Sequence, residues 1–126
     1  MQKKYDYQKY KYVSTNADYR ASKEVCLKEE FEKAIHAYET MKKECKIGLC
    51  ASMGFVSAEQ LHRLHEAGVT SYHHNIETSK RYFPQICTTH TYEQKIATLK
   101  MVKEEGMYVC SGGIIGMGES KEDVVD

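Results

Sequence analysis

The side chains best suited to chemistry in this sequence lie in three short stretches, each at the end of an apolar run. Cys50 and Cys110 end two of these runs, and the polar stretch His73-His-Asn-Ile-Glu77 follows the third. Cysteine and histidine are ligands of zinc and iron centres, whereas carboxylates and amides hydrogen-bond to the hydroxyl groups of a ligand. The three stretches therefore predict metal ligands and groups that bind a polar small molecule.

The alternating side-chain directions of a strand predict which residues of the polar stretch share a face. Successive side chains of a strand point to opposite faces, so His73, Asn75 and Glu77 are expected on one face, and His74 and Ile76 on the other. In a closed barrel the first face is the lumen, where a carboxylate could accept hydrogen bonds from ribose hydroxyls. A polar network that closes the barrel, or a solvated strand end, is the alternative interpretation.

Cys50 and Cys110 occupy corresponding places at the ends of two predicted strands. A cysteine taken alone is more often a small core side chain than a ligand. Two thiols at matching strand ends, however, could reach one metal or iron–sulfur centre inside a barrel. The glycine-rich stretch 111–118 lacks the GxGxxG spacing of a dinucleotide fingerprint. It predicts either a close approach to a ligand or an ordinary strand-to-helix loop.

A regular alternation of predicted strands and helices positions these stretches. Apolar or alternating runs predict strands at residues 10–15, 47–51, 69–72 and 107–110. Apolar residues at steps of three and four predict helices at about 24–45, 57–68 and 91–106, and another that begins at Ser120. The stripe of the third helix is Tyr92, Ile96, Leu99 and Val102. Capping boxes at Ser57 and Thr91 mark two helix starts.

Such alternation predicts an α/β fold with a parallel sheet. Four strands make about half of an eight-stranded barrel, so a partial TIM-type (β/α) barrel is expected. The chain of 126 residues is short for a complete barrel, which needs about 250. Residues 1–126 are expected to form one incomplete barrel domain, with a weakly structured lead-in over residues 1–24.

The composition argues against several classes of function. The 18 basic and 18 acidic side chains balance, so neither nucleic acid nor a membrane is expected as a partner. No apolar run is long enough to cross a bilayer, and no apolar leader follows Met1, so a cytoplasmic location is expected. Five cysteines without a CxxC pair indicate reduced thiols.

The remaining cysteines and histidines are weaker candidates. Cys26 and Cys45 fall in the first predicted helix, where Cys45 continues the apolar stripe, so core packing is expected. Cys87 lies in a loop and is expected to be a free surface or half-buried thiol. His62 and His65 are three residues apart, but the sequence shows neither HExxH nor a third zinc ligand nearby.

Four motifs, in this order and spacing, resemble the biotin synthase family of radical S-adenosylmethionine (SAM) enzymes. They are Leu49-Cys-Ala-Ser-Met-Gly54, Tyr72-His-His-Asn-Ile-Glu-Thr-Ser79, Ile86-Cys-Thr-Thr-His-Thr-Tyr-Glu93 and Val109-Cys-Ser-Gly-Gly-Ile-Ile-Gly-Met-Gly-Glu119. The resemblance implies a TIM-barrel sulfurtransferase that converts dethiobiotin to biotin. It would use SAM, a 4Fe–4S cluster, and an auxiliary iron–sulfur cluster of the 2Fe–2S type or a variant of it.

The resemblance also implies roles for single residues. Asn75 and Glu77 match positions that bind the SAM ribose, and Asn75 would also lie near dethiobiotin. Ile114 matches a residue beside the adenine. Cys50 and Cys110 match two ligands of the auxiliary cluster.

The sequence departs from the family pattern at several positions. Lys95 stands where many members have an arginine that meets the SAM carboxylate, and Lys11 where a third auxiliary-cluster cysteine is expected. Glu77 replaces the usual aspartate. The CxxxCxxC motif that holds the SAM cluster is not among the 126 residues, so an internal part of the enzyme, inactive alone, is expected.

The partners that the resemblance implies are dethiobiotin and an electron donor such as flavodoxin or ferredoxin, in an enzyme that forms a homodimer. Two alternative interpretations remain. One is a different radical SAM enzyme, related to the hydrogenase-maturation or methylornithine synthase groups. The other is a non-catalytic, truncated scaffold protein.

Overall fold

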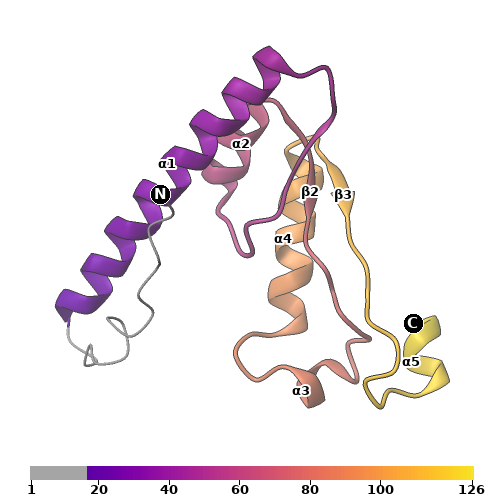
Figure 1. Cartoon of the computed structure of the whole chain (residues 1–126). Coiled ribbons are helices and arrows are strands. Elements are labelled where there is room, and N and C mark those ends of the chain that lie inside the picture. Colours follow the sequence, from indigo (N-terminus) through magenta and orange to yellow (C-terminus); the bar gives the residue numbers. More distant parts are fainter. Residues whose placement is uncertain (1–16) are drawn as a thin grey trace, which may run out of the picture. The chain divides into compact units, whose positions relative to one another are not determined.

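A computed structural model describes the backbone of residues 17–126 and the side chains of residues 27–126 (Figure 1). The chain divides into two compact units, Met1–Ala34 and Ile35–Asp126. The second unit contains the described sheet and all four motifs that carry the family resemblance. The arrangement of the candidate site residues is therefore decided within this unit.

The sheet has three parallel strands in the order β1-β2-β3. They are β1 (Leu49–Ala51), β2 (Val69–His73) and β3 (Tyr108–Cys110). Each coincides with a predicted run, so the predicted α/β alternation and parallel pairing are confirmed here. The strand predicted at residues 10–15, like Lys11, lies outside the described residues.

Helix α1 (Ala17–Glu44) begins earlier than the predicted start near residue 24. Residues 17–23 have no apolar stripe, but their alanine, arginine and lysine are good helix formers and extend the helix. Cys45 follows the last helical residue and is exposed, so its predicted core packing is wrong. Once the helix ends, steps of three and four no longer return a side chain to the buried face. No helix in the described part of the chain is long and apolar enough to cross a membrane.

Capping boxes start three of the other helices, including the two that the sequence predicts. In each, the cap hydroxyl accepts a hydrogen bond from the N–H three residues on, and the side chain of that residue accepts from the cap N–H. The caps are Ser57 for α2 (Ala58–Glu66), Thr91 for α4 (Tyr92–Glu104) and Ser120 for α5 (Lys121–Val125).

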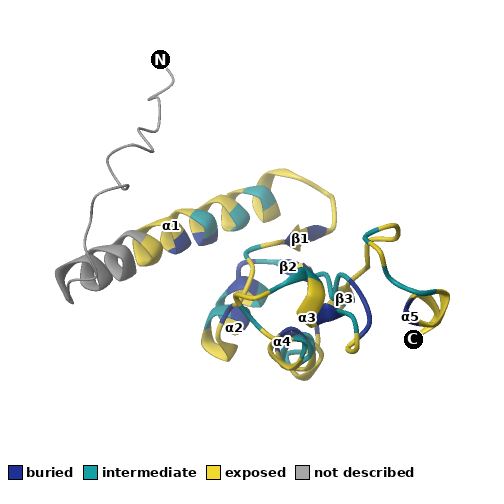
Figure 2. Ribbon diagram, turned by 90° about the horizontal axis from the view of Figure 1, so that it is seen from below, coloured by how far each residue is buried: buried dark blue, intermediate teal, exposed yellow. Residues whose placement is uncertain are grey.

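The core of the second unit lies where α2 and α4 meet each other and the sheet, as the burial colours of Figure 2 show. Its largest fully buried side chains are Tyr72, Phe83, Leu61, Leu64, Val69 and Val102. Phe83 belongs to α3 (Phe83–Ile86), a short helix in the connection between β2 and α4 that no pattern in the sequence predicts. Its first turn contains Pro84, whose fixed φ suits that position.

Helix α4 buries a more polar face than its apolar stripe predicts. Val102 is buried, but Ile96 and Leu99 are only half-buried, whereas Lys95 and Thr98 are buried. Lys95 reaches the carboxylate of Glu77, beyond the end of β2, as described below. The buried face of α4 therefore contains a charged residue that pairs across the fold, next to Val102 of the predicted stripe.

Tyr72 of β2 holds the loop that follows β1. Its side chain is fully buried, and its Oη donates to the carbonyl of Gly54 (3.0 Å) and accepts from the N–H of Met53 (3.2 Å). Burial raises the pKa of Tyr72 to about 12, because the phenolate would lose its hydration. The folded chain therefore keeps this phenol protonated at a pH where the unfolded chain ionises.

We expect the free energy of unfolding to fall as the pH rises from about 10, the ordinary pKa of tyrosine, to about 12, its value in the fold. Tyr72→Phe should remove this part of the pH dependence. It should also lower stability at neutral pH by about 1–3 kcal/mol, since the Gly54 carbonyl and the Met53 N–H lose their partner. Urea unfolding over this pH range measures both effects. Tyr108→Phe, at a side chain 78% exposed, is the matched control; identical pH profiles for the two variants would contradict the assignment.

Candidate functional site

The pairing of β2 with β3 continues beyond the ends of both strands. The N–H of Ile76 donates to the carbonyl of Gly112 (3.1 Å), and an isolated bridge then joins Glu77 to Gly113. Parallel α/β folds bind ligands at the carboxyl ends of their strands. The polar stretch and the glycine-rich stretch of the sequence thus lie side by side at that edge.

Glu77 is the only non-glycine residue in the described part of the chain with a positive φ, 68°. Its N–H donates to the Gly112 carbonyl (3.2 Å), and its own carbonyl accepts from the N–H of Ile114 (2.7 Å). Such a conformation is unfavourable for a residue with a Cβ, and the neighbouring segment maintains it. This turn, rather than strand alternation, sets the direction of the Glu77 side chain.

Gly113 lies against this turn with no room for a side chain. A Cβ at position 113 would lie 2.8 Å from the carbonyl oxygen of Glu77, closer than real Cβ contacts come. The glycine therefore permits the backbone approach on which the position of Glu77 depends.

Gly113→Ala is expected to destabilise the chain by about 1–3 kcal/mol, as overpacking against a rigid backbone does. The exchange of the Ile114 amide proton should also become faster, because its hydrogen bond to Glu77 is pushed apart. Gly48→Ala is the matched control, since its Cβ would meet only the Thr70 hydroxyl at 3.8 Å. Thermal unfolding and hydrogen exchange measure the two effects. Equal behaviour of the two variants would rule out the steric argument.

The Glu77 carboxylate forms an ion pair with Lys95 of α4. Lys95 Nζ lies 3.5 Å from Glu77 Oε1, and the two side chains are only 10% and 27% exposed. Breaking a pair with so little access to water leaves the other charge poorly solvated. The pair therefore holds the carboxylate in place, and it brings together two of the predicted site residues.

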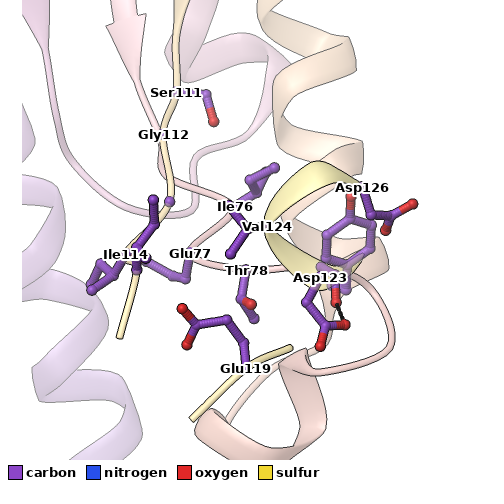
Figure 3. A pocket seen from close by; sticks show the side chains of 14 residues that line it. Ile76, Glu77, Thr78, Ser111, Gly112, Ile114, Glu119, Asp123, Val124 and Asp126 are labelled. Carbon is purple, nitrogen blue, oxygen red and sulfur yellow. Dashed lines mark hydrogen bonds between the residues drawn. The ribbon is translucent and has the colours of Figure 1, made fainter. Parts of the chain in front are cut away.

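A cavity of about 360 Å³ lies beside Glu77 (Figure 3). The segments after β2 and β3 and helix α5 form its walls, and Glu77 and Ile114 both line it. Asn75 and Lys95, two other predicted site residues, are not part of its lining. Other lining residues are Ile76, Thr78, Tyr92, Ser111, Glu119 and Val124. A cavity of this volume, apolar with a few polar groups, suits a small-molecule ligand.

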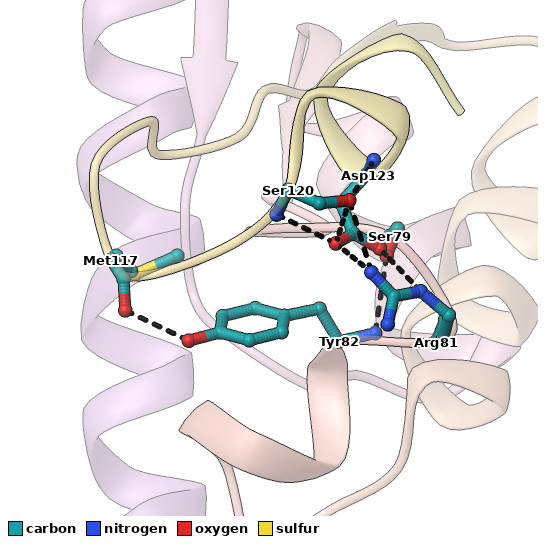
Figure 4. Close-up of polar contacts among 6 residues, drawn as sticks. All are labelled: Ser79, Arg81, Tyr82, Met117, Ser120 and Asp123. Atoms are coloured by element: carbon teal, nitrogen blue, oxygen red, sulfur yellow. Dashed lines mark hydrogen bonds and ion pairs between the residues drawn. The ribbon is translucent and has the colours of Figure 1, made fainter.

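Asp123 of α5 connects two walls of this cavity (Figure 4). Its buried carboxylate accepts hydrogen bonds from the Ser79 hydroxyl (2.6 Å) and from Arg81 Nε (3.1 Å), and it forms a second contact with the Arg81 guanidinium. The Ser120 hydroxyl donates to it as well (2.8 Å). The hydrogen bond from Ser79, followed by those from Ser120 and Arg81, holds the pKa of Asp123 well below its usual range. Helix α5 is thereby tied to the segment that follows β2.

The glycine-rich segment between β3 and α5 is held by its own Glu119 and by Tyr82. The Glu119 carboxylate accepts from the N–H groups of Gly116 and Met117, and these bonds, that of Gly116 first, lower the pKa of Glu119. The Tyr82 hydroxyl donates to the Met117 carbonyl (2.9 Å; Figure 4). These contacts order the turn that directly follows Ile114.

Cys50 and Cys110 lie on the same face of the sheet. Cys50 is paired across the sheet with Ser71 and Cys110 with His73, and paired residues of parallel strands project to the same side. Both thiols are exposed, and His73 Nδ1 lies 3.3 Å from Cys110 Sγ. Among the described residues, no three cysteine, histidine or acidic side chains gather closely enough to hold a single metal ion.

His74 projects to the opposite, buried face, as the alternation predicts. Its side chain packs edge-on against Phe55, with ring centroids 5.0 Å apart, and the residue is 5% exposed. Burial, followed by the nearby charge of Lys95, lowers the pKa of His74 and so disfavours protonation of the ring. The two adjacent histidines therefore have different environments.

His62 and His65 have an acidic partner that the sequence did not show. Both Nδ1 atoms lie close to Glu105 Oε1, at 3.0 and 3.1 Å. The hydrogen bond with Glu105 raises the pKa of His62, and the two histidines lower the pKa of Glu105. These contacts join α2 to the residue that ends α4, and no spacing within either helix indicates them.

Cys87 is a free, half-buried thiol, as predicted for a loop cysteine. Its Sγ lies 3.5 Å from the Thr89 hydroxyl and 3.5 Å from both ring nitrogens of His90. Hydrogen bonding from Thr89 lowers the pKa of Cys87. This cluster is separate from the cavity beside Glu77.

Comparison with known proteins identifies relatives over most of the chain. The family described as the Radical SAM superfamily matches residues 14–126. Biotin synthase of Clostridium beijerinckii is 60% identical over 97 residues, which is 77% of this chain and 31% of that protein. The biotin synthases of Alkaliphilus metalliredigens and Heliobacterium modesticaldum are 57% and 54% identical over 97 residues, 77% of this chain and 30% of each. The chain thus spans about 30% of the length of these relatives.

Among solved structures, methylornithine synthase matches with a TM-score of 0.70 and 17% sequence identity, over 77% of this chain and 29% of that protein. An identity this low supports the fold alone. Together with the three parallel strands and their intervening helices, the match confirms the predicted fold class, a partial TIM-type barrel.

Proposed function

The chain belongs to the radical SAM superfamily, and on this premise we propose that it forms the SAM-binding section of the barrel of a biotin synthase, which converts dethiobiotin to biotin. The observation that carries the proposal is the cavity at the carboxyl end of the sheet, lined by Glu77 and Ile114. An acidic group and an apolar side chain in one cavity suit a nucleoside, whose ribose is polar and whose base has apolar faces.

Glu77 is proposed to accept hydrogen bonds from the ribose hydroxyls of SAM. A carboxylate can accept from both hydroxyls of the diol at once, and charge-assisted bonds are stronger than neutral ones. The turn at Glu77 and the contact with Gly113 fix the backbone that carries this carboxylate. Ile114, which is 52% exposed, would pack against the adenine.

Lys95 and Asn75 would complete the binding groups. The ion pair between Lys95 and Glu77 favours a role for Lys95 in orienting the carboxylate, in addition to a contact with the SAM carboxylate. A lysine offers a point charge there rather than the two-pronged contact of an arginine. Asn75, half-buried just before the turn, would bind the ribose and lie near dethiobiotin.

When bound, a 4Fe–4S cluster would supply the electron for SAM cleavage, and the auxiliary cluster would supply the sulfur. Cys50 and Cys110 fit the auxiliary cluster, because both thiols are free and exposed on one face of the sheet. The barrel section would keep SAM and dethiobiotin together and away from water. The CxxxCxxC motif of the SAM cluster is not among these 126 residues, so other residues would have to supply it.

Activity of the complete enzyme tests the proposal. Incubated with dethiobiotin, SAM, iron, sulfide and reduced flavodoxin or ferredoxin, it is expected to form biotin together with 5′-deoxyadenosine and methionine, each measured by mass spectrometry. Formation of 5′-deoxyadenosine without biotin would overturn the substrate assignment and favour another reaction of the superfamily. Sedimentation of the same preparation tests the homodimer that the family resemblance implies.

A further inference from the structure

His73 is placed to act together with the two cysteines on the exposed face of the sheet. Its Nδ1 lies 3.3 Å from Cys110 Sγ, and the two residues are direct partners in the pairing of β2 with β3. A neutral imidazole nitrogen and a thiolate are both ligands of iron and of other borderline metals. The contact therefore joins two donors of the same chemical class.

Cys50 belongs to the same face, on the other side of the central strand. Its partner in the pairing of β1 with β2 is Ser71, two residues before His73, so Ser71 and His73 project to the same side. Because β2 lies between β1 and β3, the side chain of His73 stands between the strands that carry the two thiols. The imidazole thus lies on the strand between the two that carry the thiols, beside one of them.

The neighbouring histidine cannot take this place. His74 points to the opposite face, is 5% exposed and packs edge-on against Phe55. His73 is half-buried, and Cys110 beside it is exposed. Because side chains alternate along the strand, His73 and not His74 lies on the face that carries the thiols.

The spacing of these donors suits a cluster rather than a single ion. No three such side chains in the described part of the chain converge on one ion position. In an iron–sulfur cluster, however, the protein ligands bind different iron atoms, and histidine can replace cysteine on one of them. Donors spread over three adjacent strands then no longer need to meet at one point.

We propose that His73 is a ligand of the auxiliary iron–sulfur cluster, alongside Cys50 and Cys110. This inference rests on the proposed function, which assigns only the two cysteines to that cluster. The neutral imidazole would bind one iron through Nδ1, the nitrogen nearest Cys110, while both thiols bind as thiolates after losing their protons. Imidazole ligation should give the cluster a higher reduction potential than ligation by cysteine in the same place.

Pulsed electron paramagnetic resonance of the complete enzyme, reduced and without SAM, tests this ligand directly. In protein labelled with ¹⁵N-histidine, the auxiliary cluster is expected to show a ¹⁵N hyperfine coupling. His73→Asn should abolish the coupling and lower the bound iron. His73→Cys should abolish the coupling while the bound iron is retained. Loss of the coupling in this variant could then not be attributed to loss of the cluster. His36→Ala, at a side chain 85% exposed on α1, is the matched control and should leave the coupling unchanged.

The possible results separate the two proposals. If the auxiliary cluster forms without a histidine coupling, or if the coupling persists in both His73 variants, His73 is not a ligand. In that case, biotin formation by the wild-type enzyme still supports the proposed function. If the wild-type enzyme makes no biotin and binds no auxiliary iron, both proposals fall. A coupling that is present in the wild type and the control, and absent from both His73 variants, supports the assignment.

Discussion

Glu77→Ala is expected to weaken SAM binding by the complete enzyme about 100-fold or more and to abolish 5′-deoxyadenosine formation. Two hydrogen bonds to the charged carboxylate contribute about 1.5 kcal/mol or more each, and the loss of about 3 kcal/mol corresponds to about 100-fold in affinity. Isothermal titration with SAM measures the affinity. Glu93→Ala is the matched control, because this glutamate is 60% exposed and pairs with Lys80 on the surface.

A second pair of variants separates lost binding from lost stability. Removing the Glu77 charge also leaves Lys95, only 10% exposed, without its partner. Glu77→Gln combined with Lys95→Met removes both charges and should restore stability relative to Glu77→Gln alone, since neither charge is then left unpaired. SAM affinity should stay low in the double variant. A return of affinity with stability would show that Glu77 supports the fold rather than the ribose.

Cys110→Ala is expected to stop biotin formation while SAM is still cleaved. The thiol would be lost from the auxiliary cluster, which supplies the sulfur, whereas the cavity beside Glu77 does not include Cys110. Quantifying 5′-deoxyadenosine and biotin in the same reaction measures the separation of the two steps. The visible absorbance of the auxiliary cluster should be lost at the same time.

The control for this variant is another exposed thiol. Cys45 lies in the connection from α1 to the start of β1, and Cys45→Ala should leave both products unchanged. Auxiliary-cluster absorbance that is unchanged in Cys110→Ala would remove this cysteine from the ligand set. Loss of both products would instead mean that Cys110 supports SAM binding or the fold.

Hydrogen bonds within the protein order the walls of the cavity. Asp123 joins α5 to the segment after β2 through Ser79 and Arg81, and Glu119 binds backbone N–H groups of the glycine-rich segment. Prearranged groups lose less conformational freedom when a ligand binds. Residues outside the proposed contacts with SAM therefore also contribute to its binding.

Local patterns in the sequence determined where the strands and most of the helices of this protein lie. Apolar runs predicted the three described strands, and the capping boxes at Ser57 and Thr91 predicted two helix starts that the structure confirms. These signals are readable because a strand, a helix stripe or a cap involves residues only a few positions apart. The parallel order followed from the alternation of the elements, and the placement of His74 opposite His73 followed from the pleat. The family resemblance, confirmed for the superfamily, came from motifs in a fixed order.

Only the tertiary structure decided which distant residues meet. Lys95 shares the buried face of α4 with Val102, a position that the stripe did not predict for it, and there it pairs with Glu77. Glu105 reaches two histidines of another helix, and the left-handed turn at Glu77 exists because Gly113 lets another segment approach it. Each of these features depends on how elements pack across the fold, a property that no local period encodes. The sequence by itself thus determined which residues are available for chemistry, whereas packing decided that Glu77 faces a cavity and that His73 lies beside Cys110.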